Sequence, residues 1–226
     1  MFDVFLILLI LFGTPSTIDM CLEFFRFGSI SQILHFLMEV LFVLLNFFYL
    51  DEDNEKCAEY HGNKHLTKMQ VEYAQIGSTV FRAVSKGEVP EGIYKSTHVK
   101  HPVVLWAQKS RANVMRIIDV GIALEKERLK RKKVGNKTNW VERHASQNVL
   151  ELLKEIMPGP EHFEEGDKWS EPPQCVPDFI RNLNTDVIDA YRLTYAGPKS
   201  GFLKWDYAEV PPFIEGCRKR LRDLVH

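Results

Sequence analysis

After position 50, apolar residues recur at steps of three and four, and no segment alternates at the period of two that marks a β-strand. The clearest case is residues 64–85, where Leu66, Met69, Tyr73 and Ile76 share one helical face. The same spacing and the helix-capping signals predict further helices at residues 51–60, 102–106, 117–133, 140–156, 185–195 and 215–225. The sequence therefore predicts an all-α fold, a single compact multi-helix domain.

Two parts of unlike composition meet near residue 50. The first fifty residues hold ten of the fifteen Phe and no Lys, with one base against four acids. The remainder carries 28 bases against 26 acids, so the net charge of −1 sums a negative part and a weakly positive one. The roughly 176 residues after the break suffice for one ordinary domain with its own core.

Residues 1–45 are interpreted as a hydrophobic extension of a domain that spans residues 46–226. Residues 4–12 resemble the apolar core of a signal peptide, but no positive charge precedes them. Residues 33–50 have the length of a membrane span, yet Glu39 within them costs about 2.5–3.5 kcal/mol in a bilayer. Three interpretations stay open: an upstream or removable leader, a membrane anchor, and a buried helical hairpin.

Several classes of site are disfavoured by missing motifs. There is no P-loop, no G-x-G-x-x-G and no G-x-S-x-G, which argues against P-loop nucleotide hydrolysis, dinucleotide redox chemistry and α/β-hydrolase chemistry. The four cysteines form no C-x-x-C pair, so neither a zinc ribbon nor a dense disulfide framework is indicated. We expect them to be reduced thiols and expect no cofactor.

A polar stripe on the predicted 64–85 helix is the most informative candidate for chemistry. His65, Lys68, Glu72 and Gln75 follow one another at three- and four-residue intervals, which places them on one face. A carboxylate in a desolvated cleft acquires a raised pKa suited to acid/base work, whereas one beside a cation stays ionised. The alternative is a solvated face with an i, i+4 ion pair between Lys68 and Glu72.

Four of the eight histidines occur as two pairs, His61 with His65 and His98 with His101. On helices both spacings could present two imidazoles to one metal, with Glu72 as general base or third ligand. A metal-dependent hydrolase is therefore one alternative. Because no H-E-x-x-H is present and histidines at helix starts often act as caps, no metal site is predicted.

Basic residues suggest contacts with nucleic acid. The runs at residues 126–133 and 218–222 would suit phosphate contacts, although either could be a solvated helix end. Near the C-terminus aromatic and basic side chains interleave, as suits base stacking, although a core role is as natural for the aromatic ones. A helical DNA-binding module without catalysis is a further alternative.

Three segments carry a resemblance to a known family. They are NFFYLDEDNEKCAEYHGNKHLTKMQVEYAQ (residues 46–75), THVKHPVVLWAQKSRAN (97–113) and AYRLTYAGPKSGFLKW (190–205). In this order they resemble a group of small proteins from phages and large DNA viruses that look like distant members of the pyrimidine-dimer DNA glycosylase superfamily. The resemblance covers about 165 residues of the chain.

The resemblance implies a glycosylase/AP lyase that acts on damaged or modified bases in double-stranded DNA. In that family the N-terminal α-amine attacks the sugar C1′, and a glutamate seven residues after a His-Leu pair assists; Glu72 holds that place after His65 and Leu66. A start near Asn46 would place an amine at the family's separation from Glu72. Otherwise Lys68 must supply the amine, or lyase chemistry is lost.

The predicted site joins catalytic and DNA-contacting residues. The catalytic set is Glu72 as acid/base, His65 as a supporting group and Lys68. The DNA-binding set is Lys64, Gln75, His98, His101, Arg111, Asn113, Arg192, Lys199 and Lys204. The family's glutamate is flanked by arginines, whereas this chain has Val71 and Gln75 around Glu72. We expect a monomer located with the viral or host genome, in cytoplasm or nucleus, touching a membrane only if residues 1–45 are retained.

Overall fold

The computed structural model describes residues 46–201 and 203–224, which belong to one compact unit. The predictions about residues 1–45 lie outside these residues. Within the described part the secondary structure is helical and contains no strand, so the all-α prediction is confirmed. None of the helices described is long and apolar enough to cross a membrane.

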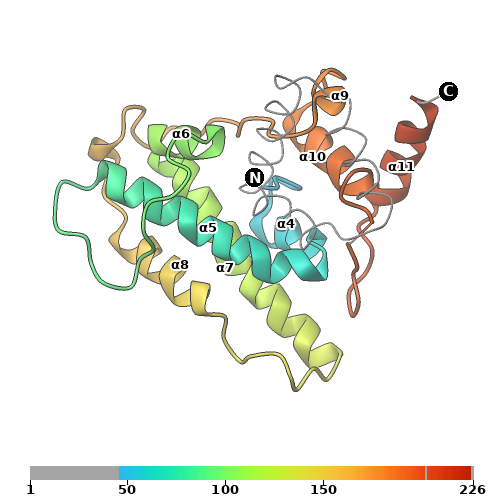
Figure 1. Ribbon diagram of the computed structural model, residues 1–226, viewed down its shortest axis with the longest axis horizontal. Helices are drawn as coiled ribbons and strands as arrows, with labels where there is room; N and C mark the ends of the chain where they lie inside the picture. The colour runs from blue at the N-terminus through green and yellow to red at the C-terminus, as the bar shows by residue number, and fades with distance from the viewer. Residues whose placement is uncertain (1–45, 202, 225–226) are drawn as a thin grey trace, which may run out of the picture. The chain divides into compact units, whose positions relative to one another are not determined.

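Two long helices form the centre of the domain. Helix α5 (Asn63–Val84) packs along α7 (Arg111–Val134), and α8 (Ala145–Ile156) lies against both (Figure 1). Helix α4 (Asn54–Tyr60) also packs on α7, and α6 (Pro102–Lys109) contacts α5 and α7. The apolar face predicted for residues 64–85 is the buried face of α5, with Leu66, Met69, Tyr73 and Ile76 fully inaccessible.

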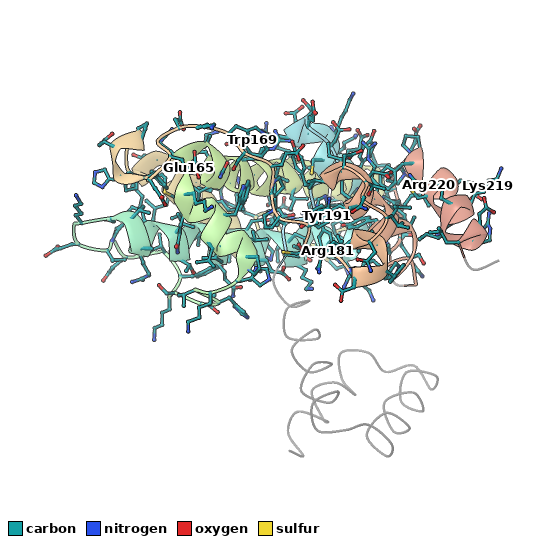
Figure 2. All side chains as sticks on the ribbon, turned by 90° about the horizontal axis from the view of Figure 1, so that it is seen from above. Glu165, Trp169, Arg181, Tyr191, Lys219 and Arg220 are labelled. Carbon is teal, nitrogen blue, oxygen red and sulfur yellow. The ribbon has the colours of Figure 1, made fainter. Side chains whose placement is uncertain are left out.

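The C-terminal part contributes the remaining helices. A short 3-10 turn (Pro160–His162) and helix α9 (Asp178–Arg181) follow α8 in the chain, and α9 was not predicted. Helices α10 (Val187–Ala196) and α11 (Phe213–Asp223) pack on each other. Arg220 lies on α11 (Figure 2). It donates to Asp189 of α10 at 2.8 and 2.9 Å.

Two helix starts differ from the prediction by five residues or more. Helix α7 begins at Arg111, six residues before the predicted start, because Asn113 and Val114 are already buried against the rest of the core. Helix α8 begins five residues after the predicted start, since the side chain of His144 accepts from Ser146 N and caps the helix there. Arg128 also binds the carbonyl of Val141, which holds the preceding segment outside the helix.

Residues 46–50 form a non-helical segment that lies in the core. It contacts both the central helices and residues of the candidate site. All five residues are buried. The Phe47 ring stacks on Trp106 and meets Tyr73 edge-on, while Phe48 stacks on His65. Burying two aromatic side chains stabilises the fold by several kcal/mol, so this segment is an integral part of the domain.

The basic run at residues 126–133 is only partly a surface feature. Arg128 is 2% exposed and donates to Glu125 at 2.7 and 2.8 Å. Arg131 is fully buried and donates to Glu127 at 2.7 Å. These two cations are therefore occupied in the core and do not reach an external phosphate.

Candidate active site

Glu72 lies on α5 with only 5% of its surface exposed. One carboxylate oxygen accepts from the backbone N–H of Asn46 at 3.0 Å, and the other lies 3.1 Å from Nζ of Lys68. Burial raises the pKa of Glu72, while the Lys68 charge and the Asn46 hydrogen bond oppose that rise. The polar stripe is thus an ion pair with a buried carboxylate, and a raised pKa moves a carboxyl toward the range that acid/base catalysis uses.

Asn46 is held at both ends of its side chain, which places its backbone nitrogen beside Glu72. Its amide Nδ2 donates to the carbonyl of Cys175 at 2.9 Å. Its Oδ1 accepts from Phe47 N at 2.8 Å and from the Tyr191 hydroxyl at 3.2 Å. Tyr191 lies inside the domain (Figure 2) and is fully buried, so the contact between Asn46 and Glu72 belongs to a fixed network.

His65, one turn before Lys68 and two turns before Glu72, is 2% exposed. Its Nδ1 lies 2.5 Å from the Tyr195 hydroxyl of α10, and its ring stacks on Phe48 with centroids 5.0 Å apart. Burial lowers the pKa of His65 well below its usual value, and the charges of nearby groups including Lys68 add to this. His65 is therefore neutral at physiological pH, and it can orient neighbours and pass a proton without carrying a charge.

His61 belongs to a second buried chain of hydrogen bonds. Its Nδ1 lies 2.6 Å from the carbonyl of Cys57, which can only accept, so this nitrogen carries the proton. Its Nε2 then accepts from the Tyr73 hydroxyl at 3.3 Å, and that hydroxyl in turn accepts from Phe48 N. Burial lowers the pKa of His61 to about 4, so the ring is neutral and structural.

Lys199 brings a second ammonium toward Glu72 from the turn that follows α10. Its side chain is half-buried. Burial lowers the pKa of Lys199 to about 8, the charge of Lys68 acts in the same direction, and Glu72 opposes both. The predicted catalytic residues His65, Lys68 and Glu72 therefore lie together, and Lys199, predicted as a DNA contact, joins them.

The other predicted DNA contacts are dispersed. Four of them are occupied within the fold: Arg192 pairs with Asp51, Arg111 donates to the carbonyl of Pro158, Asn113 binds Trp106 and Ser170, and His101 caps α6. Lys64, His98 and Lys204 are exposed and Gln75 is half-buried. Of the predicted DNA-binding set, the exposed residues, Gln75 and Lys199 are the ones placed to meet a ligand.

Lys64 also lines an open pocket of about 440 Å³ next to the stripe. Its walls come from α5, α7 and two loops, and comprise Asn63, Lys64, Thr67, Arg128, Lys137, Trp140, Val141, Asp206 and Tyr207. The Lys137 ammonium lies 4.9 Å from the centre of the Tyr207 ring. Cations beside aromatic rings are a combination that suits phosphate and base together.

The tyrosines that hold the site were not predicted as site residues. Tyr73 lies on the apolar face of α5, so its spacing indicates core packing alone. Tyr191 and Tyr195 were interpreted as stacking or core residues, yet each directs its hydroxyl to Asn46 or His65. Their i, i+4 spacing on one helix is the one signal that could have grouped them.

The two histidine pairs do not form a metal centre in the part of the chain that the structure describes. No group of three or more His, Cys, Asp or Glu side chains there lies close enough to share an ion. The rings of His61 and His65 are 6.4 Å apart and each is bonded to a tyrosine hydroxyl, whereas His98 is exposed. The side chain of His101 accepts from Val103 N and caps α6.

No family model matches the chain, and no curated protein or solved structure matches it either. The geometry of the site therefore carries the functional argument.

Proposed function

We propose that residues 46–226 act as a DNA glycosylase/AP lyase-like enzyme on damaged or modified bases in DNA, with Glu72 as the general acid/base. The observation that carries this proposal is the 3.0 Å contact between the backbone nitrogen of Asn46 and the buried carboxylate of Glu72. In the family that the sequence resembles, an N-terminal amine and a glutamate work together. A polypeptide that starts at Asn46 would carry its α-amine at this contact.

The chemistry would follow from that pair. An α-amine has a pKa near 7.7–8.0 and is partly unprotonated at neutral pH, as a nucleophile must be. The amine attacks C1′ and the base leaves, taking a proton; ring opening then gives an imine between the nitrogen and C1′. Glu72 accepts the proton from C2′ as the 3′ phosphate leaves, and water finally hydrolyses the imine.

Recognition of damaged DNA would depend on two features. They are the cations that bind phosphate and the free-energy cost of extruding a base from the duplex. Extruding a base from the duplex costs a few kcal/mol, and damage that weakens stacking reduces this cost. Val71 and Gln75 stand where the family has arginines. Lys64 and Lys68, which precede Glu72 on α5, are therefore the nearest cations for phosphate. They hold phosphate as point charges, so affinity should be salt-sensitive and independent of sequence.

The test is borohydride trapping on duplex DNA with one abasic site. A protein cut directly before Asn46 should give a covalent complex, because borohydride reduces the imine to a stable amine. The matched Glu72→Gln protein should bind the same DNA within about threefold and lose strand cleavage by about 100-fold or more, as typical for removal of a general base. DNA binding without any adduct would instead support a non-catalytic DNA-binding module.

A further inference from the structure

The open pocket beside the start of α5 consists, apart from Lys64, of residues that the proposed catalysis does not use. Its volume of about 440 Å³ falls in the range of small-molecule sites. Its chemically distinctive lining residues are two lysines, two aromatic rings and a carboxylate: Lys64, Lys137, Trp140, Tyr207 and Asp206. The pocket therefore combines cations, aromatic surface and a hydrogen-bond acceptor outside the proposed catalytic cluster.

Tyr207 occupies a strained backbone position on the wall of this pocket. Its φ is +68°, in the left-handed region that residues with a Cβ rarely adopt. Its ring lies so close to Gly135 that a Cβ on that glycine would come within 2.7 Å of the ring. Strain of this kind persists only where the surrounding structure enforces it, and such positions cluster at ligand-binding sites. The loop therefore presents an exposed aromatic ring in a fixed place.

Hydrogen bonds fasten the walls of the pocket to the central helices. Asn63, the first residue of α5, donates from Nδ2 to Asp206 at 3.1 Å. Its backbone N–H donates to the carbonyl of Lys204 at 2.7 Å. In the second loop, the carbonyl of Val141 accepts from Arg128 of α7 at 3.0 Å. Both loops are thus fixed by the fold, so the pocket is formed before a ligand arrives.

The two lysines of the pocket are available to an anion. Neither pairs with a carboxylate among the residues that the structure describes, unlike Lys68 and Lys126. The Lys137 ammonium instead lies 4.9 Å from the centre of the Tyr207 ring. A nucleotide carries its phosphate one sugar away from its base, and a cation beside a stacking ring matches that arrangement. An ammonium binds phosphate as a point charge.

We propose that this pocket binds a nucleoside monophosphate unit, either free or within a single strand of DNA. The base stacks on Tyr207 and Trp140, and the phosphate meets Lys64 and Lys137. Asp206 accepts an N–H of the base, as carboxylates do from the amino groups of bases. Binding of this unit goes beyond the proposed function and needs no catalytic step.

The experiment is calorimetric titration of the full-length chain with deoxyguanosine monophosphate, which offers both a phosphate and base N–H groups. We expect it to bind about tenfold or more tightly than deoxyguanosine or inorganic phosphate, because the pocket holds both of its parts at once. Tyr207→Ala should weaken binding by about fivefold or more, the loss expected for one stacked base. Phe179→Ala is the matched control: Phe179 is an exposed ring on α9 outside the pocket, and the affinity should stay the same.

A second variant removes a charge instead of a ring. Lys137→Met should weaken binding of the nucleotide by about threefold or more, because one ammonium that meets the phosphate is lost. Lys86→Met is its control, since Lys86 is exposed in the loop after α5 and does not line the pocket. Competition with a single-stranded oligonucleotide identifies the source of the ligand. A strand that displaces the nucleotide occupies the pocket itself, whereas one that leaves the affinity unchanged assigns the pocket to the free nucleotide.

Several results would overturn the inference. They are no binding of deoxyguanosine monophosphate at millimolar concentration, an affinity no greater than that for inorganic phosphate, or an affinity that Tyr207→Ala or Lys137→Met leaves unchanged. The first two are measured on the unmodified protein, so they decide even if a variant fails to fold. None of these results bears on borohydride trapping at an abasic site, so the proposed function is judged separately.

Discussion

A carboxylate buried as deeply as Glu72 costs the fold stability, and its two partners only partly offset that cost. Asn46 N–H and Lys68 each contact one oxygen, yet burial remains the largest influence on its pKa. A buried carboxyl with a raised pKa is the kind of group that functional sites often contain, which is why the proposed function gives Glu72 the role of proton carrier.

Glu72→Gln should leave stability at pH 7 unchanged or raise it by about 1 kcal/mol, because the neutral amide avoids the cost of burying a charge. The amide oxygen can still accept from Asn46 N. The folded pKa of Glu72 is raised, so its favourable contribution exists at low pH and is lost as pH rises through that value. The free energy of unfolding in urea, compared between the variant and the unmodified protein, should therefore shift in favour of the variant between pH 4 and pH 7. A loss above about 2 kcal/mol at pH 7 would contradict this account.

For single residues, the sequence predicted only which side chains of α5 share a face. Helical spacing brings His65, Lys68 and Glu72 together, because the period of the helix is a local property. The contacts of Glu72 with Asn46 and of His65 with Tyr195 join residues 26 and 130 positions apart, so local pattern contains no trace of them. Burial, which decides the state of Glu72, is likewise a property of the folded chain.

Among the elements, α7 fixes the entry to α5 through one buried guanidinium. Arg131 donates to the carbonyls of Glu59 and His61, to the side chain of Asn63 and to the carboxylate of Glu127, at 2.7 to 2.9 Å. It thereby satisfies carbonyls at the end of α4 and holds the turn that leads into α5. A cation with this many partners acts as a tie between helices.

Arg131→Met should lower the free energy of unfolding by about 3–5 kcal/mol, since it leaves Glu127 without its buried partner. The side chain of Met is of similar length, so lost packing is not the main cause. Guanidinium unfolding followed by circular dichroism measures the change. Arg143→Met is the control: Arg143 pairs with Glu151 on a half-exposed surface, and we expect a loss below about 1 kcal/mol. Equal losses of unfolding free energy from both variants would contradict the proposed role of Arg131 in joining these helices.

The basic run at residues 126–133, which contains Arg131, shows why charge composition alone does not predict which residues of a helix are exposed. The sequence of residues 126–133 looks like a charged surface, because spacing alone does not say how many sides of a helix are covered. Helix α7 is contacted by α4, α5, α6 and α8, so it buries charges that pair along its own length. The helix starts at Arg111 and Ala145 escaped prediction for a related reason. The N–H of Arg111 donates to the carbonyl of Gly166, and the N–H of His144 donates to the carboxylate of Glu125, and both pairs are distant in the sequence.

For the whole molecule, two buried neutral histidines link stability to pH. The pKa of His61 falls to about 4 in the folded state, against 6.5 for the ordinary side chain, and that of His65 is also lowered. A lowered folded pKa means that the unfolded chain binds protons first. The associated stability is therefore complete above pH 6.5 and is lost as pH falls toward 4.

We expect His61 to account for on the order of 3 kcal/mol of this loss, at about 1.4 kcal/mol for each unit of pKa difference. His61→Gln should be less stable than the unmodified protein at pH 7. The difference between their free energies of unfolding should decrease steadily between pH 6.5 and pH 4. Urea titrations across this range measure it. His98→Gln is the matched control, because His98 is exposed and its substitution should leave the slope unchanged. A gap that stays constant with pH would rule out this assignment.

The buried segment at residues 46–50 also sets an order of events during synthesis. Its partners Tyr191 and Tyr195 emerge from the ribosome some 145 residues later, and the bond from Trp205 to Tyr60 spans a similar distance. Earlier helices can form and pair as they appear, but the space around Phe48 closes only when α10 arrives. Until α10 is made, the nascent chain therefore exposes the aromatic surface of residues 46–50, and such surface is prone to aggregation.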